Sequence, residues 1–361
     1  MDPRIQWEQI PSLCSPCIET KSGPVTIRRG HFQGGTSQGV EVVLIDTGVL
    51  TIAVLPTRGM GIWKMQSAGI EFGWRSPVPG PVHPSLVPTS SSGGLGWLEG
   101  FDELLVRCGL HSNGAAELNE AGVVKFPLHG SIANTPATRV WVEIDESTGR
   151  VTLAGEVVEA QFLIKRLRLI SRVSVFSGSD TVQITDEVTN DLSTPNTAQL
   201  LYHINIGAPM LSAGAELLAT PSWFEPKDAL SRSEADVWTK VGPPQDQFHE
   251  RVYFTQLQSD SKQQAAACLR SANGEAGFGL RYDTSTLPYF TFWRNTAAIS
   301  DGYVVGLEPA TNLPNTRSVE TAAGRVVSLA PHQSVTFRLE LSALVGRTKV
   351  DAFCARLPSK A

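Results

Sequence analysis

The sequence is poor in cysteine, in clustered positive charge and in long apolar runs. Five cysteines among 361 residues are an odd number and too few for a disulfide framework, so we expect reduced thiols. Cys14 and Cys17 have the spacing of half a zinc site, but no second Cys or His pair follows to complete four ligands. No βαβ pattern follows them either, so a redox pair is not favoured.

Charge and hydropathy exclude further classes of protein. The 30 basic and 35 acidic residues give a net charge of −5 without a basic cluster, so nucleic acid is not expected as a partner. No apolar run approaches the ~18 residues of a membrane span, and the first residues lack the pattern of a signal peptide. We therefore expect a soluble protein of the cytoplasm without a membrane partner.

Short alternating runs bounded by Gly, Asn, Asp and Ser recur from end to end, whereas helical periodicity is scarce. This pattern predicts an all-β protein. A chain of this length often divides into two domains, but large β-sandwiches exceed ~150 residues as single units. Because no linker or repeat interrupts the sequence, we expect one domain over residues 1–361.

Several segments give more specific predictions. The alternating runs predict strand pairs within residues 41–55, 141–158 and 166–188, and two last strands at 325–329 and 334–344. Residues 76–99 and 208–250 fit no strand, and loops of this length are usually functional lids or insertions. Between them, the apolar spacing in residues 98–109 predicts one short helix.

The strand at residues 200–207 has polar groups on one face. Alternation puts the apolar side chains from Tyr202 to Ile206 on a core face, and His203 and Asn205 on the other. An imidazole titrates near neutral pH, so proton transfer is one role that such a pair could have. The alternative is a core histidine that is satisfied by a neighbouring group.

Three other polar residues stand among glycines and prolines at strand ends. They are His129, Glu308 and Arg58. A carboxylate and two imidazoles at strand ends are the ingredients of an acid–base pair. The alternatives are a turn histidine, a solvated strand-end charge and a salt-bridge partner. Two histidines and a glutamate would also suit zinc, but their spacing follows no zinc motif, so no metal is expected.

The aromatic run at residues 287–295 predicts a strand that ends in Trp293 and Arg294. A tryptophan beside an arginine could stack on a sugar ring and hydrogen-bond its hydroxyls. The alternative is an ordinary sandwich core with a capping arginine.

Four motifs occur in one order along the chain: Leu-His-Gly at 128–130, Tyr-His-Ile-Asn at 202–205, Leu-Pro-Tyr-Phe-Thr-Phe-Trp at 287–293 and Leu-Glu-Pro at 307–309. That order resembles the galactose mutarotase-like superfamily, the aldose 1-epimerases. The resemblance covers about residues 25–345.

Further motifs make the chain similar to a divergent branch of this superfamily, a domain-of-unknown-function family (DUF4432-like). These motifs are Pro-Thr-Arg-Gly-Met-Gly at 56–61, Gly-Trp-Leu at 96–98, Cys-Gly-Leu at 108–110 and Asn-Thr-Pro-Ala at 134–137.

The resemblance implies a β-supersandwich of mainly antiparallel strands with few short helices, and a sugar site on one concave sheet. It implies that His203 is the general acid, with Asn205 alongside, that Glu308 is the base, and that His129 belongs to the catalytic set. Glu308 would take the proton of the anomeric hydroxyl while His203 protonates the ring oxygen, and closure after rotation gives the other anomer. No cofactor is implied.

The chain differs from well-studied mutarotases at positions where those enzymes bind the sugar. It lacks their Asn-Arg ahead of the His129 motif, and it has Ser131 instead of a second glycine. Three further arginines, Arg58, Arg107 and Arg294, could form planar, bidentate hydrogen bonds with an anionic sugar, such as a uronate, sulfonate or sugar phosphate. The residues expected to contact the substrate are Arg58, Asn205, Arg107, Trp293 and Arg294.

The expected function is an isomerase that interconverts anomers, or epimers, of a modified aldose, acting as a monomer or homodimer on a small-molecule sugar. One alternative is a carbohydrate-binding or sensing module without turnover, although binding alone does not need a carboxylate opposite an imidazole. A second alternative is a lyase or hydrolase that uses the same acid and base on an oxidised or acidic sugar.

Overall fold

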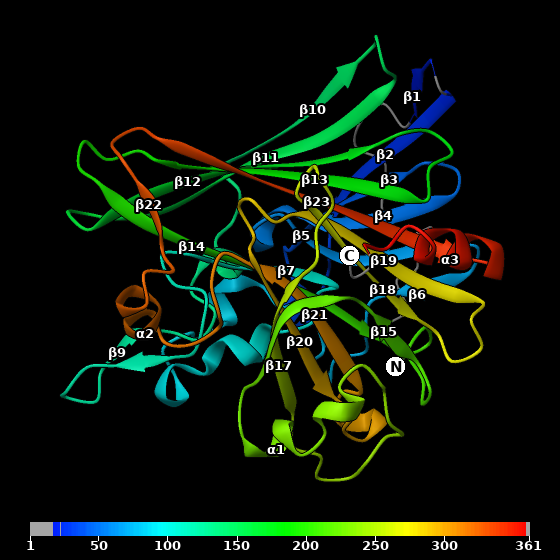
Figure 1. The fold of residues 1–361 in the computed structure, drawn as a ribbon. Coiled ribbons are helices and arrows are strands. Elements are labelled where there is room, and N and C mark those ends of the chain that lie inside the picture. Colours follow the sequence, from blue (N-terminus) through cyan, green and yellow to red (C-terminus); the bar gives the residue numbers. More distant parts are fainter. Residues whose placement is uncertain (1–16, 22, 359–361) are drawn as a thin grey trace.

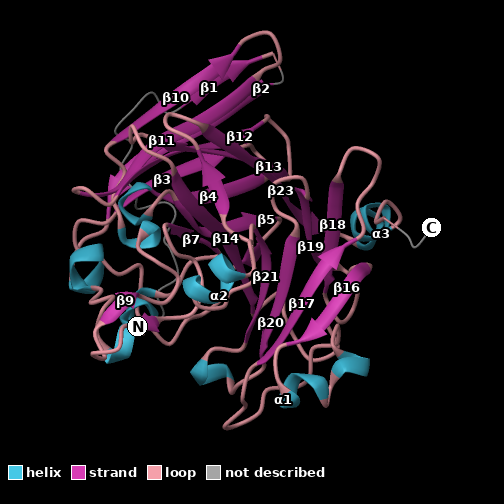
Figure 2. Ribbon diagram, turned by 60° about the vertical axis from the view of Figure 1, so that its left-hand side comes forward, coloured by secondary structure: helices cyan, strands magenta, loops and turns pink. Residues whose placement is uncertain are grey.

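Two large antiparallel β-sheets enclose the main core in the computed structural model of the chain (Figures 1 and 2), which describes residues 17–21 and 23–358. The all-β prediction is confirmed. Among the described residues, three short α-helices lie at the periphery of Figure 1: α1 (Ala229–Arg232), α2 (Arg317–Ala322) and α3 (Arg347–Cys354).

The larger sheet has 13 strands in the order β1-β2-β3-β4-β5-β7-β14-β21-β20-β17-β16, with β6 paired to β5 and β22 to β14. Its strands are β1 (Cys17–Thr20), β2 (Gly23–His31), β3 (Glu41–Asp46), β4 (Leu50–Leu55), β5 (Gly61–Ser67), β6 (Ile70–Phe72), β7 (Leu105–Leu110), β14 (Asn196–Gly207), β16 (Pro221–Pro226), β17 (Arg251–Leu257), β20 (Tyr289–Asn295), β21 (Val304–Ala310) and β22 (Val327–Leu329).

The smaller sheet has eight strands in the order β10-β11-β12-β13-β23-β19-β18-β15. Its strands are β10 (Arg139–Asp145), β11 (Arg150–Gln161), β12 (Lys165–Val175), β13 (Thr181–Asn190), β15 (Glu216–Leu218), β18 (Gln264–Arg270), β19 (Ala276–Asp283) and β23 (Ser334–Val345). A separate hairpin consists of β8 (Glu117–Leu118) and β9 (Val124–Phe126).

Strand β14 shows how the sequence separates the two faces of the larger sheet. Tyr202 and Ile204 lie in the main core between the sheets, whereas Leu201 packs in a second apolar cluster on the opposite face. Trp97 and Phe101, which precede β7, belong to that second cluster and cover the outer face. The polar face of β14 is therefore roofed by loop residues rather than by the other sheet.

The predicted hairpins within residues 41–55, 141–158 and 166–188 are confirmed. Both last strands also form, but β22 joins the larger sheet and β23 the smaller one. Residues 76–99 contain no strand, as expected.

Two segment predictions are wrong. Residues 208–250 contain β15, β16 and α1. Residues 98–109 do not form an α-helix, because a 3-10 turn at Gly96–Gly100 is followed by β7, all of whose residues are buried. A strand buried on both faces has a continuous apolar run, and periodicity alone does not distinguish such a run from a buried helix.

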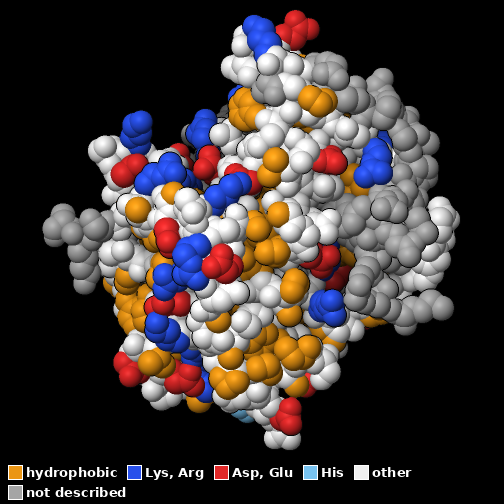
Figure 3. All heavy atoms as spheres, turned by 90° about the vertical axis from the view of Figure 1, so that its right-hand side faces the viewer, with side chains coloured by type: hydrophobic (Ala, Val, Ile, Leu, Met, Phe, Trp, Pro, Cys, Tyr) orange, Lys and Arg blue, Asp and Glu red, His pale blue; other side chains and the backbone are white. Residues whose placement is uncertain are grey.

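Basic and acidic side chains are interspersed on the face of the molecule in Figure 3. None of the helices that the structure describes is long and apolar enough to cross a membrane. Cys108, Cys268 and Cys354 are free thiols. The Cys14–Cys17 spacing lies outside the residues whose side chains are described.

A buried ion pair connects the two sheets. Arg107 on β7 and Asp186 on β13 have Nε and Oδ2 2.5 Å apart, and neither side chain is exposed. The Tyr202 hydroxyl donates to the same carboxylate over 2.8 Å, and Arg107 also donates to the Met60 carbonyl over 2.6 Å. Because every partner is buried, this network fixes the position of the central strands across the core.

Replacing Arg107 with methionine is expected to lower the free energy of unfolding by about 3–5 kcal/mol, because the Asp186 carboxylate would stay buried without its countercharge. Urea-induced unfolding measures the change. The control Arg347→Met removes an exposed ion pair with Glu275 and is expected to cost less than about 1 kcal/mol. Equal losses in the two variants would contradict a structural role for Arg107.

Candidate functional site

A cavity of about 310 Å³ lies on the outer face of the larger sheet, over β14, β20 and β21. Its roof comes from the loops that contain Trp97 and Leu128. The structure brings four of the predicted site residues into this one cavity, which are His129, His203, Trp293 and Glu308.

His203 is held in one orientation by its neighbour on β14. Its Nδ1 lies 2.6 Å from Asn205 Oδ1. The Asn205 amide donates from Nδ2 to the carbonyls of Glu103 and His203, so its Oδ1 accepts and the His203 Nδ1 carries the hydrogen. In the neutral ring Nε2 is then unprotonated, and it faces Glu308 Oε1 over 3.2 Å. Asn205 is fully buried behind His203, so it positions the imidazole and does not line the cavity.

Glu308 and His203 are removed from water together, with 3 % and 5 % exposure. Burial, and to a smaller extent the charge of Glu250, raises the pKa of Glu308 well above its usual range. Burial, and then the proximity of His129, lowers the pKa of His203 to about 3. Both shifts disfavour the charged forms, so the pair holds one proton between the Glu308 carboxyl and the His203 Nε2.

Gly306 leaves the space that this pair occupies. It lies two residues before Glu308 on the same face of β21. A Cβ atom at this position would lie 2.7 Å from Glu308 Oε1 and 3.2 Å from His203 Cε1. A side chain here would displace the carboxylate, so the glycine is needed for the geometry of the pair.

His129 lies beside the pair, with its ring centroid 5.5 Å from that of His203. Its Nδ1 lies 2.9 Å from the Asn113 carbonyl, which only accepts, so Nδ1 carries the hydrogen and Nε2 remains an acceptor. Burial lowers the pKa of His129 to about 4. Asn113 exchanges two side-chain hydrogen bonds of 2.9 Å with Asn312, which connects this turn to the chain after β21.

Aromatic rings keep water from His203. The centroids of Phe101 and Trp293 lie 5.1 and 5.3 Å from that of the imidazole. At the mouth of the cavity, the indole Nε1 of Trp293 donates to Glu250 over 2.7 Å, and Lys227 pairs with the same carboxylate over 3.1 Å. This network fixes the Trp293 ring.

Sequence reasoning did not identify Phe101, Thr291, Lys227 and Glu250 as residues that line the cavity. Thr291 alternates with Trp293 on one strand face, so the period of two could have found it. Lys227 and Glu250 come from the long segment that was expected to lack strands, and no motif marks them.

The three arginines predicted to bind substrate do not line the cavity. Arg58 pairs with Glu103 and is 1 % exposed. Arg294 pairs with Glu234, and Arg107 belongs to the network between the sheets. Each guanidinium already binds a carboxylate and at least one backbone carbonyl. The structure therefore argues against the anionic grip that these arginines were expected to form.

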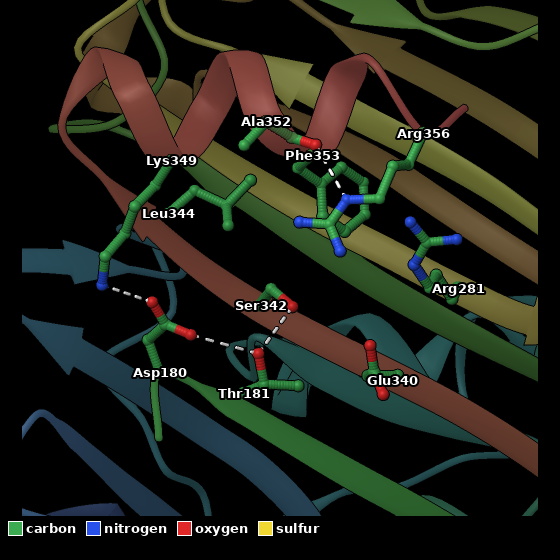
Figure 4. Close-up of a pocket in the computed structure, with 10 residues that line it drawn as sticks. All are labelled: Asp180, Thr181, Arg281, Glu340, Ser342, Leu344, Lys349, Ala352, Phe353 and Arg356. Atoms are coloured by element: carbon green, nitrogen blue, oxygen red, sulfur yellow. Dashed lines mark hydrogen bonds and ion pairs between the residues drawn. The ribbon is translucent and has the colours of Figure 1, made fainter. Parts of the chain in front are cut away.

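Three other hollows among the described residues contain none of the predicted site residues. One of about 260 Å³ lies between α3 and β23 (Figure 4), where Lys349 pairs with Asp180 over 2.5 Å. Arg281 and Arg356 also line it. Another, of about 550 Å³, lies beside β5 and β6. Within the part of the chain that the structure describes, no group of three or more His, Cys, Asp or Glu side chains is placed to hold a metal ion.

Residues 37–343 match the model of a family described as a domain of unknown function, DUF4432. The chain belongs to the DUF4432 family. The motif-based assignment to this branch is therefore confirmed. None of the curated proteins compared with the chain matches it.

Solved structures share the fold of this DUF4432 protein. A candidate aldose 1-epimerase from Klebsiella pneumoniae subsp. pneumoniae MGH 78578 is 33% identical, with a TM-score of 0.89 over 92% of this chain and 87% of that chain. A galactose mutarotase-like protein from Clostridium acetobutylicum is 14% identical, with a TM-score of 0.61 over 89% and 99% of the two chains. These likenesses confirm the galactose mutarotase-like fold.

The burial of His129 predicts that the stability of the folded protein depends on pH. The folded state binds a proton at this ring only near pH 4, whereas an ordinary histidine of the unfolded chain binds one below about pH 6.5. Stability is therefore lost as the pH falls from about 6.5 to 4, by up to roughly 1.4 kcal/mol per pH unit. His129→Asn is expected to lose less stability than the wild type between pH 7 and pH 5, measured by urea unfolding.

The matched control is His249→Asn, which changes an exposed histidine outside the cavity. We expect this variant to follow the wild-type pH dependence. If His129→Asn also followed the wild-type pH dependence, burial of His129 would not contribute to the loss of stability at low pH.

Proposed function

We propose that this DUF4432 protein is a carbohydrate isomerase of the aldose 1-epimerase type, which interconverts the anomers of a sugar by acid–base ring opening. The observation that carries the proposal is the buried 3.2 Å contact between Glu308 Oε1 and His203 Nε2 in a cavity with aromatic walls. Such a pair holds an acid and a base within reach of the two oxygens on one anomeric carbon.

The single proton of the pair suits this reaction. A sugar hydroxyl that donates a hydrogen bond to Glu308 favours its carboxylate form, so the shared proton then lies on His203 Nε2. Glu308 accepts the proton of the anomeric hydroxyl, and His203 gives its proton to the ring oxygen as the bond between C1 and that oxygen breaks. Each transfer contributes about 10²–10⁴-fold to the rate.

The same proton count permits closure to either anomer. After ring opening the pair still holds one proton, now on Glu308 instead of His203. Rotation about the C1–C2 bond exposes the other face of the carbonyl. Glu308 then returns a proton to the carbonyl oxygen, and His203 takes one from the ring hydroxyl. All protons come from the pair and the sugar.

Neighbouring groups support these steps in the proposal. The unprotonated Nε2 of His129 would accept a hydrogen bond from a sugar hydroxyl, and the face of Trp293 would stack on the sugar ring. Asn205 is a positioning residue, because its Oδ1 holds the Nδ1 hydrogen of His203 and so directs Nε2 toward Glu308.

An uncharged sugar fits the charges of the site better than an anionic one. The pair and its one proton carry no net charge, and Lys227 and Glu250 offset each other at the mouth. The arginines that would have favoured a uronate, sulfonate or phosphate are paired elsewhere in the fold.

Glu308→Gln is expected to slow catalysed anomer exchange at least about 100-fold, because an amide cannot accept the proton. Saturation-transfer NMR on single anomers of neutral sugars and uronates measures the exchange rate. The control is Glu99→Gln, which changes an exposed glutamate of the covering loop outside the cavity and should retain the wild-type rate.

If Glu308→Gln catalysed anomer exchange at the wild-type rate, the role of Glu308 as the base would be contradicted. Binding of sugars by the wild type without any accelerated exchange would contradict isomerase activity and favour a sensing role.

A further inference from the structure

The candidate active site offers few hydrogen-bonding side chains beyond the acid–base pair. The other polar residues of its described wall are His129, Lys227, Glu250 and Thr291, with no Arg, Asn, Gln or Asp among them. Lys227 and Glu250 pair with each other, and Glu250 also accepts from Trp293. His129 Nε2, the Thr291 hydroxyl and the indole Nε1 of Trp97 remain for additional sugar hydroxyls, and the last two are buried groups without a hydrogen-bond partner among the described residues.

Most of the wall is apolar. Its aliphatic side chains are those of Leu95, Leu98, Ala115, Leu128, Val252 and Pro314. Leu95 and Leu98 are 45% and 46% exposed, so they present apolar surface to water at the cavity. Exposed apolar groups at a concave site mark the surface that a ligand covers.

This wall discriminates among sugars by desolvation. A hydroxyl that leaves water and finds no partner costs binding free energy, whereas a C–H or methyl group in the same place gains it. A hexose has four hydroxyls away from C1, which is more than the three unpaired side-chain groups of the described wall. A sugar with fewer hydroxyls matches the wall.

We propose that the substrate is an uncharged deoxy aldose, in which a hydroxyl away from C1 is replaced by hydrogen. The apolar edge of this sugar contacts Leu95 and Leu98, while its anomeric carbon and ring oxygen face Glu308 and His203. The inference rests on the proposed function, because it names the class of sugar that the same site takes.

The experiment compares matched pairs of sugars that differ by one hydroxyl: glucose and galactose with their 2-, 3-, 4- and 6-deoxy analogues. Two readouts are taken on the wild type. NMR titration at anomeric equilibrium gives the dissociation constant without requiring turnover, and saturation transfer gives the exchange rate. At least one deoxy analogue is expected to bind about tenfold or more tightly than its parent and to exchange with a correspondingly higher kcat/KM.

Leu98→Gln tests the assigned wall, because it adds a hydrogen-bonding group where the structure has an apolar one. It is expected to reduce the preference for the deoxy analogue at least about threefold. The control Leu86→Gln changes an exposed leucine that does not line the cavity and should leave the preference unchanged.

The outcomes separate the two proposals. Parent sugars that bind as tightly as all their deoxy analogues would overturn the deoxy-sugar inference, even if exchange is catalysed. Tighter binding of a deoxy analogue without exchange would support the inference about the wall and contradict isomerase activity. Absence of binding by every sugar would overturn both.

Discussion

The contact between His203 and Glu308 depends on the pairing of β14 with β21. The register Ile204 to Leu307 and Asn205 to Gly306 sets the two residues opposite each other on the outer face of the sheet. No loop lies between the imidazole and the carboxylate, so their separation is set by strand spacing. Groups on paired strands hold a functional geometry better than groups on loops. The missing side chain at Gly306 then provides the room for both.

Support for the pair extends behind it through residues that do not touch the cavity. Arg58 anchors the side chain of Glu103, whose backbone carbonyl accepts from Asn205, and Asn205 in turn holds His203. An arginine that the sequence suggested as a substrate contact thus stabilises the site from behind. Arg107 also acts outside the cavity, because its ion pair with Asp186 connects the larger sheet to the smaller one. Both guanidinium groups therefore act outside the cavity, where they stabilise the strands and loops that hold the pair.

Strand alternation predicted the all-β fold and the faces of His203, Glu308 and Trp293, because a period of two fixes which side chains share a face. The sequence could not reveal the partners of the arginines. Glu103 lies 45 residues from Arg58, and Glu234 lies 60 residues from Arg294, so their pairing is a product of the tertiary fold. The second half of the short helix expected at residues 98–109 is the central strand β7, because burial on both faces removes the alternation that would identify a strand. Glu250 reaches the cavity because it directly precedes β17, which pairs with β20 and places it beside Trp293, and no sequence motif marks this position.

The protonation state of His203 shows directly whether the buried pair is neutral. Nitrogen NMR of the ¹⁵N-histidine-labelled protein at pH 7, assigned with His203→Gln, reports the state of each ring nitrogen. We expect a hydrogen on Nδ1 and an Nε2 that accepts from Glu308, and we expect Glu308→Ala to lose that acceptor signature. A ring protonated on both nitrogens would show that Glu308 is ionised, and a hydrogen on Nε2 alone would show that Asn205 does not hold Nδ1; either result would contradict the neutral pair.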